Sequence, residues 1–365
     1  MRRSKPPYRA DHVGSLLRPP PVKEARARRQ HGDISAAELR EVEDREISRV
    51  VAKQAALGLH TATDGEIRRG SWHRDFCLFL DGIEEISGQP GIPFKGVTAP
   101  AFNMKIAGPL HFPANHPHLD HFRFLKEHAK TATPKMTIPS PSVLAPPRLA
   151  EDGWYRDVAT LHRDMGQVYR DAIRAFYEAG CRYLQIDEVR IVSWADPAYR
   201  SRANLRTDDP EEQLRTFARL VNSALEGRPA DMTISMHNCR GNFRSSWVAE
   251  GGYEPVAELL FNLKGIDAYF LEFDSERAGG FEPLRLLPKD KIAVLGLVTT
   301  KSGVLEAKDT IKRRLDEAGK FIDLDRVCLS PQCGFASTEE GNNLSEDEQW
   351  AKLAFVRDIA EEVWG

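Results

Sequence analysis

The chain has 365 residues, with 51 lysines and arginines against 54 aspartates and glutamates, and a formal net charge of −3. This balance gives no basic footprint for a nucleic acid, and no apolar run approaches the roughly 18 residues that span a bilayer. Five cysteines without paired spacing, and a first segment without an apolar signal core, predict a cytoplasmic protein with reduced thiols.

Short apolar runs alternate with longer helical patterns along the chain. The predicted strands cover residues 9–13, 60–63, 136–139, 182–186, 232–236, 268–271, 293–297 and 327–329. A capping box at Ser35 and Glu38 opens the first long helix, which runs to about residue 57. The later predicted helices cover residues 154–179, 210–225 and 346–363. Residues 87–135 are rich in Pro, Gly and His, which predicts an insertion with one or two hairpins that is the candidate for covering a binding site.

Eight strands separated by helices predict an α/β fold with a closed parallel sheet. We expect a (β/α)8 TIM barrel with an insertion between the second and third strands, in a single domain that covers residues 1–365. An open doubly wound sheet is the alternative. No Gly-rich phosphate turn follows the first strand to favour it.

Candidate metal ligands follow the fifth, sixth and eighth predicted strands. His237 and Cys239 are two residues apart on one strand, so their side chains project to the same face. This pair alone is also typical of a buried core. Glu272 and Cys333 follow neighbouring strands, at the mouth where the carboxyl ends of barrel strands meet. One imidazole, two thiolates and a carboxylate make a tetrahedral zinc set, whereas separately Cys333 fits a core residue and Glu272 an ion-pair partner.

Two thiolates and a carboxylate would give zinc an excess of negative charge, which suits thiol activation better than water activation. Glu66 follows the second strand, and Asp187 with Glu188 follows the fourth, where they are expected to accept hydrogen bonds from an ammonium group. Backbone N–H groups near Gly14 and Ser15 are expected to hold a carboxylate. These expectations describe an amino-acid thiol. The alternative for the carboxylates is pairing with a nearby arginine, and the candidates are Arg68, Arg69 and Arg190.

Short stretches from the first strand to the last resemble the cobalamin-independent methionine synthase family, in its short single-barrel form. They are His12-Val13-Gly14-Ser15, Thr63-Asp64-Gly65-Glu66, Gln185-Ile186-Asp187-Glu188, His237-Asn238-Cys239, Leu271-Glu272 and Ser330-Pro331-Gln332-Cys333-Gly334-Phe335. The resemblance implies a methyltransferase that transfers a methyl group from a methyltetrahydrofolate to the zinc-bound thiolate of homocysteine, giving methionine. It also implies zinc on His237, Cys239, Glu272 and Cys333.

The sequence departs from this family in the residues expected to deliver a proton and to stack on the donor. Residues 298–302 after the seventh strand contain no histidine, so His12, His73 or Lys301 would have to act as the general acid. Residues 138–142 contain no tryptophan, so Trp72 or Trp194 would have to replace the stacking ring. The second, N-terminal barrel of the longer family members has no counterpart in this sequence.

Several alternatives therefore stay open for the second substrate and for the reaction. The donor can be a folate, a methylated corrinoid or other methyl-carrier protein, or a small methylated compound. A zinc-dependent lyase that joins a small thiol to an epoxide is the second candidate, although an acidic ammonium pocket argues against a sulfonate thiol. A barrel with structural zinc, or a non-catalytic partner of a methyl-carrier protein, is the third. The oligomeric state does not follow from the sequence.

Overall fold

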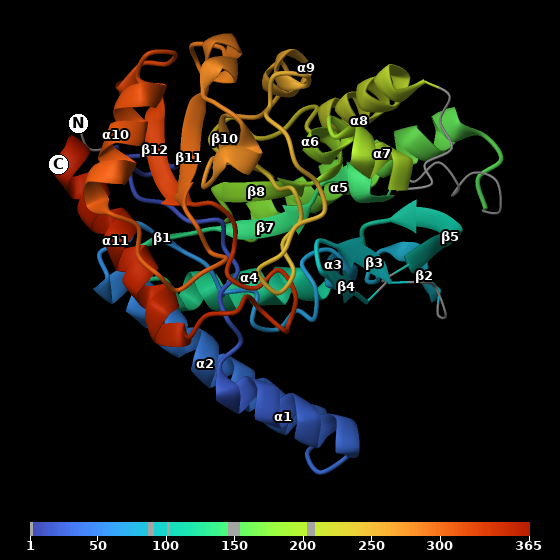
Figure 1. The fold of residues 1–365 in the computed structure, drawn as a ribbon. Helices are drawn as coiled ribbons and strands as arrows, with labels where there is room; N and C mark the ends of the chain where they lie inside the picture. Colours follow the sequence, from blue (N-terminus) through green and yellow to red (C-terminus); the bar gives the residue numbers. More distant parts are fainter. Residues whose placement is uncertain (1–2, 87–90, 101–102, 145–153, 203–208) are drawn as a thin grey trace.

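Six parallel strands form the central sheet, and they lie side by side in their order along the chain (Figure 1). The computed structural model describes residues 3–86, 91–100, 103–144, 154–202 and 209–365. The six strands are β7 (Met136–Pro139), β8 (Tyr183–Glu188), β9 (Thr233–Asn238), β10 (Ala268–Glu272), β11 (Ile292–Val298) and β12 (Val327–Pro331). Each overlaps one of the predicted strands, which gives the parallel α/β sheet that was predicted. β8 and β9 begin one residue later than predicted, and all but β7 extend one or two residues beyond the predicted end.

The N-terminal part of the chain links the two edges of this sheet. At one edge, Ala10 forms a parallel bridge with Leu329 of β12. At the other, β1 (Thr61–Ala62) pairs in parallel with β6 (Thr133–Pro134), which directly precedes β7. The strand predicted for residues 9–13 is confirmed at that one bridge only. Two other backbone carbonyls of this segment accept hydrogen bonds from side chains: Lys135 donates to the His12 carbonyl, and Gln185 donates to the Val13 carbonyl.

The longer helices surround the sheet, and their ends follow the capping residues (Figure 1). The predicted capping box opens α2 (Ala36–Ala56), where the Ser35 hydroxyl accepts from the Glu38 N–H. The helix predicted from residue 154 begins later, as α5 (Val158–Glu178), because the Asp157 carboxylate caps it by accepting from two backbone N–H groups. The other helices are α1 (Pro20–His31), α6 (Arg190–Trp194), α7 (Pro197–Arg202), α8 (Pro210–Ala224), α9 (Ala257–Phe261), α10 (Lys308–Ala318) and α11 (Glu346–Trp364).

The region between β1 and β7 has its own small elements. β2 (Asp81–Ile86) pairs with β5 (Asn103–His111) in antiparallel, and β3 (Ile92–Phe94) forms a hairpin with β4 (Val97–Ala99). The predicted hairpins are therefore present. The helices α3 (Arg74–Cys77) and α4 (Pro117–His128) were not predicted. In α4 the buried residues Leu119, Phe122 and Leu125 recur every three positions, a helical spacing within a segment otherwise rich in histidine.

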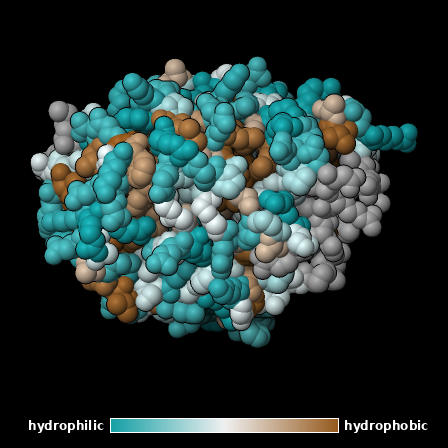
Figure 2. All heavy atoms as spheres, turned by 45° about the horizontal axis from the view of Figure 1, so that its top comes forward, coloured by the Kyte–Doolittle hydropathy of each residue, from teal (hydrophilic) through white to brown (hydrophobic). Residues whose placement is uncertain are grey.

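The outer surface carries mainly polar side chains. Figure 2 shows a face on which hydrophilic residues predominate and hydrophobic residues form separate small groups. Within the described ranges, none of the helices is both long and apolar enough to cross a bilayer. The apolar side chains instead form one large core between the sheet and the surrounding helices.

Candidate metal centre and substrate cavity

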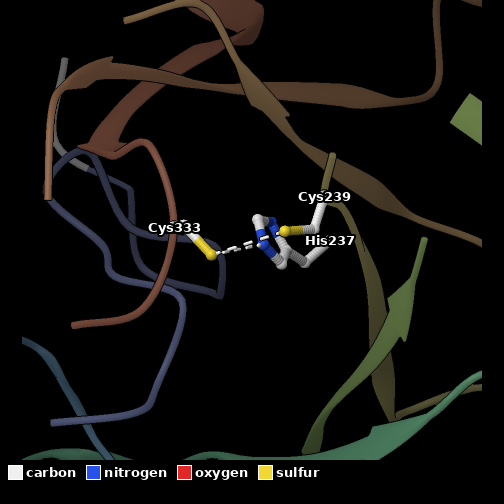
Figure 3. A group of neighbouring side chains, drawn as sticks. All are labelled: His237, Cys239 and Cys333. Atoms are coloured by element: carbon white, nitrogen blue, oxygen red, sulfur yellow. Dashed lines mark hydrogen bonds between the residues drawn. The ribbon is translucent and has the colours of Figure 1, made fainter. Parts of the chain in front are cut away.

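Three predicted metal ligands converge at the carboxyl ends of β9 and β12. His237 lies in β9, Cys239 directly follows it, and Cys333 lies two residues beyond β12. The Cys333 sulfur is 3.4 Å from Nε2 of His237 and 3.6 Å from the Cys239 sulfur. Figure 3 shows the Cys333 sulfur pointing across to the two side chains from β9. The alternation of side chains along a strand therefore brings an imidazole and a thiol to the same face, as predicted.

The spacing of these three atoms fits a tetrahedral zinc ion. Zinc–sulfur bonds of about 2.3 Å and zinc–nitrogen bonds of about 2.0 Å place ligand atoms about 3.5–3.8 Å apart. The measured separations of 3.4 and 3.6 Å are close to this range. Nδ1 of His237 has no hydrogen-bond partner among the described residues, so Nε2 carries the interaction with sulfur. Two sulfurs and one nitrogen leave room for a fourth ligand.

The protein environment alone does not favour a free thiolate at Cys239. Its hydrogen bond with Cys333 and its burial raise the pKa of this thiol well above the usual value. Burial by itself lowers the pKa of His237, but the neighbouring Cys239, Asp187 and Glu272 raise it. A bound cation reverses this preference, because a coordinating thiol is deprotonated. The donor set is thus suited to a metal ion rather than to a pair of reactive thiols.

Glu272, the fourth predicted ligand, lies next to the three-residue cluster without belonging to it. Its Oε1 is 3.8 Å from the Cys239 sulfur and accepts a hydrogen bond of 2.9 Å from Gln332. Its Oε2 accepts from the Arg240 backbone N–H at 3.1 Å and lies 3.6 Å from Arg277. Burial would raise the pKa of Glu272, but Arg277 and Arg240 lower it, so the carboxylate is ionised. Its coordination of a metal remains a prediction.

A cavity of about 410 Å³ opens beside the cluster. We define its inner wall by the strand-end residues Ser15, Glu66, Asp187, His237, Cys239 and Cys333, and its outer wall by the loop and helix residues Trp72, His73, Phe94, Arg190, Tyr199 and Phe243. The inner wall holds most of the residues that were singled out in the sequence. The outer wall is largely aromatic. Three of its residues, Trp72, His73 and Arg190, were also named from the sequence, whereas Phe94, Tyr199 and Phe243 were not.

Glu66 lines the cavity, and its two carboxylate oxygens differ in their partners. Its Oε1 accepts from the Thr137 hydroxyl at 2.7 Å and lies 3.5 Å from the Arg69 guanidinium. Its Oε2 is buried and has no hydrogen-bond partner among the described residues. The expected alternative, pairing with an arginine, is therefore present at one oxygen only. The residue adopts φ +56°, and the preceding Gly65 adopts φ +65°, so the chain turns sharply here.

Asp187 lies beside His237 in the register of β8 and β9. Its Oδ1 accepts from the Gln185 side chain at 2.7 Å. Burial and the nearby carboxylate of Glu66 raise the pKa of Asp187 to about 7, against the opposing influence of His237. Burial therefore disfavours the charged form of Asp187, and the neighbouring carboxylate of Glu66 adds to this effect.

Glu188 lies outside the cavity, contrary to the prediction. Its Oε2 accepts from the Ser142 hydroxyl at 2.7 Å, and its Oε1 accepts from the backbone N–H groups of Arg190 and Ile191 at 2.5 and 3.0 Å. Neighbouring residues on a strand point to opposite faces, so Asp187 and Glu188 cannot both face the mouth of the sheet. Glu188 holds the first turn of α6 in place.

The turn at Gly14 and Ser15 packs tightly against two other loops. Gly14 has φ +141°, and a Cβ there would lie 2.9 Å from the Thr137 methyl group. Ser15 lines the cavity, and its hydroxyl accepts from the Ala336 N–H at 3.4 Å. A Cβ on Gly334 would lie only 1.9 Å from that hydroxyl, so glycine is required there for the close approach of the two loops.

Of the three predicted proton donors, His73 alone lines the cavity. Burial and the charge of Arg190 lower the pKa of His73 to about 4. The His12 side chain is buried next to α2, where burial and Lys135 lower its pKa to about 4. The ammonium group of Lys301 donates instead to the Asn242 side chain and to the Ser246 carbonyl, at 3.1 and 3.2 Å.

The β3–β4 hairpin contributes to the outer wall, as expected for a segment that covers the site. Phe94 packs on Phe243 with ring centroids 5.6 Å apart. The next residue, Lys95, donates from its backbone N–H to the Trp247 carbonyl at 2.9 Å and accepts from the Ser246 hydroxyl at 2.6 Å. The hairpin is thus bonded to the loop after β9 that carries Cys239. No local pattern indicates such a contact between segments about 150 residues apart.

Only one of the two predicted replacement tryptophans reaches the cavity. Trp72 lines the outer wall next to His73, with ring centroids 4.6 Å apart. Trp194 is buried, donates to the Pro210 carbonyl at 2.8 Å and packs edge-on against Phe217. It belongs to the core around α6 and α8.

Comparison with known proteins agrees with this site. The family model described as cobalamin-independent synthase, catalytic domain, matches residues 135–362. Uncharacterized protein YxjH of Bacillus subtilis is 49% identical over 364 residues, which cover 100% of this chain and 96% of that protein. Methionine synthase of Saccharolobus solfataricus is 26% identical over 327 residues, covering 88% of this chain and 86% of that protein.

A solved structure shows the same fold. It is that of a candidate vitamin-B12-independent methionine synthase from Listeria monocytogenes, with 38% identity, a TM-score of 0.78 and coverage of 98% of both chains. The family match and these similarities bear out the resemblance noted in the sequence. The chain therefore belongs to the cobalamin-independent methionine synthase catalytic-domain family of methyltransferases, in a short form with a His/Cys/Cys candidate metal site.

Proposed function

We propose that this protein is a zinc-dependent S-methyltransferase that converts homocysteine to methionine, with a methyltetrahydrofolate as methyl donor. One observation carries the proposal. The His237, Cys239 and Cys333 cluster opens on the same cavity as the carboxylates of Glu66 and Asp187. A soft donor set and an acidic pocket side by side suit a molecule with a thiol and an ammonium group.

Each functional group of the acceptor has a complement on the inner wall. Zn²⁺ held by the cluster, with Glu272 as the proposed fourth ligand, would keep the substrate thiol as a thiolate near neutral pH. Oε2 of Glu66, which has no hydrogen-bond partner among the described residues, and the carboxylate of Asp187 would accept hydrogen bonds from the ammonium group. Backbone N–H groups of the Gly14–Ser15 turn hold the carboxylate.

The transfer itself exchanges one bond for another. The substrate sulfur bonds to the methyl carbon while the carbon–nitrogen bond of the donor breaks, and the departing nitrogen takes a proton. We assign His73 to this proton transfer, because it lines the cavity while His12 and Lys301 do not. With a pKa of about 4, its imidazolium is a strong acid, and roughly one ring in a thousand is protonated at pH 7.

We also propose that residues 1–365 form one (β/α)8 barrel domain. The contacts of residue 10 with β12 and of β1 with β6 support this, because they link both edges of the central sheet. The elements from β2 to β5 are then an insertion between the second and third strands. A cytoplasmic location fits the five cysteines, all of which are free thiols.

Zinc K-edge absorption of the zinc-loaded protein tests the proposed acceptor. Titration with homocysteine should add one sulfur to the two supplied by Cys239 and Cys333, and methionine should form when 5-methyltetrahydrofolate is added. Cys333→Ser should lose both zinc and activity. Cys181→Ser is the matched control, because that buried thiol lies outside the metal cluster. An unchanged sulfur shell in the presence of homocysteine contradicts the proposal.

A further inference from the structure

The outer wall of the cavity contains one guanidinium group without a partner. Arg190 is half-buried and begins α6, and its backbone N–H is fixed by the Glu188 carboxylate at 2.5 Å. Among the cavity-lining residues that the structure describes, it is the one lysine or arginine. None of the described side chains or carbonyls accepts a hydrogen bond from its guanidinium. By contrast, the buried Arg240 bonds to Gly251, Tyr253 and Glu272.

Arg190 lies on the outer wall at the start of α6, whereas Asp187 lies in β8 on the inner wall. It follows Asp187 by three residues, a distance of up to about 10 Å along an extended chain. Its charge acts on His73, which contacts Trp72. Phe94 and Tyr199 line the same outer wall. A guanidinium beside aromatic rings is suited to a ligand that has both a planar or apolar part and an anionic group.

We infer that Arg190 is the residue that recognises the methyl donor, by binding a carboxylate of the donor while Trp72 and Phe94 contact its methyl-bearing ring. This inference rests on the proposed function and adds a specificity determinant to it. An arginine fork pairs with a carboxylate through two parallel hydrogen bonds, and an unpaired guanidinium in a half-buried wall gains most from such a partner. A donor that offers no carboxylate at this point would not be selected.

The test compares Arg190→Gln and Arg190→Lys with the wild type in the zinc-loaded full chain. Calorimetry with 5-methyltetrahydrofolate monoglutamate gives the donor Kd, and initial rates give the KM of donor and of homocysteine. Arg190→Gln should raise the Kd of the folate about 10- to 100-fold, which is the effect of losing one charge-assisted hydrogen-bonded pair. Arg190→Lys should recover part of this loss, because it keeps the charge without the fork. The KM of homocysteine should stay unchanged.

Arg215→Gln is the matched control, since this exposed arginine on α8 pairs with Glu211 far from the cavity lining. Methylcobalamin, as a second donor probe, should show no dependence on Arg190. The inference is overturned if Arg190→Gln keeps the donor Kd within twofold, if it raises the KM of homocysteine instead, or if the wild type does not bind the folate. The zinc–sulfur measurement in the same variants reports separately on the proposed function, because thiol coordination does not require Arg190.

Discussion

Replacing Glu66 by Gln should weaken the binding of homocysteine strongly, because the two carboxylate oxygens of Glu66 have different partners. Oε1 faces two donors, the Thr137 hydroxyl at 2.7 Å and the Arg69 guanidinium at 3.5 Å. A glutamine would therefore turn its carbonyl oxygen toward them and its NH2 group to the position of Oε2, which has no hydrogen-bond partner among the described residues. That NH2 group would meet the substrate ammonium, donor against donor. The variant loses one charged hydrogen bond of about 1.5–3 kcal/mol, which corresponds to about 10- to 100-fold in Kd.

A ligand without the amino group isolates this contact. We would titrate zinc-loaded wild type and Glu66→Gln by calorimetry with homocysteine and with 4-sulfanylbutanoate, which is homocysteine lacking its amine. The loss of affinity in Glu66→Gln should be large for homocysteine and less than about threefold for 4-sulfanylbutanoate, and the amount of bound zinc should be the same in both proteins. An equal loss for both ligands would show that the variant disturbs the cavity as a whole. An undiminished affinity for homocysteine would remove Glu66 from the ammonium site.

Three further predictions concern packing and protonation. Gly334→Ala places a Cβ 1.9 Å from the Ser15 hydroxyl, so it should destabilise the fold by about 1–3 kcal/mol in urea unfolding and weaken the binding of homocysteine. Gly70→Ala, whose Cβ is 3.7 Å or more from other atoms, should have neither effect. Burial lowers the pKa of His118 well below its usual value, so the unfolded chain takes up the proton first as the pH falls. At pH values below about 6.5, the free energy of unfolding should therefore decrease by up to about 1.4 kcal/mol for each pH unit. His118→Phe should reduce this slope, and an unchanged slope would exclude His118 as its cause. An ammonium group should lower the pKa of Asp187 from about 7, so homocysteine should release about half a proton more than 4-sulfanylbutanoate at pH 7 in calorimetry with two buffers. Equal release would argue against that contact.

The strand ends and the pairing of two candidate metal ligands could be predicted from the sequence because they depend on local rules. A short apolar run followed by a polar residue marks the end of a buried strand, and the alternation of side chains then pairs His237 with Cys239. The same rule fails when a boundary is placed too early. The fourth strand was predicted to end at residue 186, but β8 continues to Glu188, and this extension turns Glu188 away from the cavity that Asp187 faces.

The side of the outer wall formed by the β3–β4 hairpin could not be predicted, because it depends on contacts between distant segments. Phe94 meets Phe243 from a hairpin about 150 residues earlier, and the sequence around either residue gives no sign of the other. The position of Arg190 depends on Glu188, which fixes the start of α6. Sequence patterns thus indicate what a strand end presents to the cavity, while the loops and hairpins that cover it must be seen in three dimensions.

The charged side chains around the cavity are relevant to both the thiol acceptor and the methyl donor. Around Glu272, the proposed fourth zinc ligand, the fold supplies two cations, Arg240 and Arg277. Glu66 keeps an oxygen without a partner among the described residues, and burial together with the carboxylate of Glu66 raises the pKa of Asp187. The outer wall carries Arg190, the one lysine or arginine of the described cavity lining, and none of the described side chains pairs with its guanidinium. An ammonium group inside and a carboxylate outside would satisfy both walls, and this polarity would place the thiol acceptor at the metal ligands and the methyl donor beneath the aromatic hairpin.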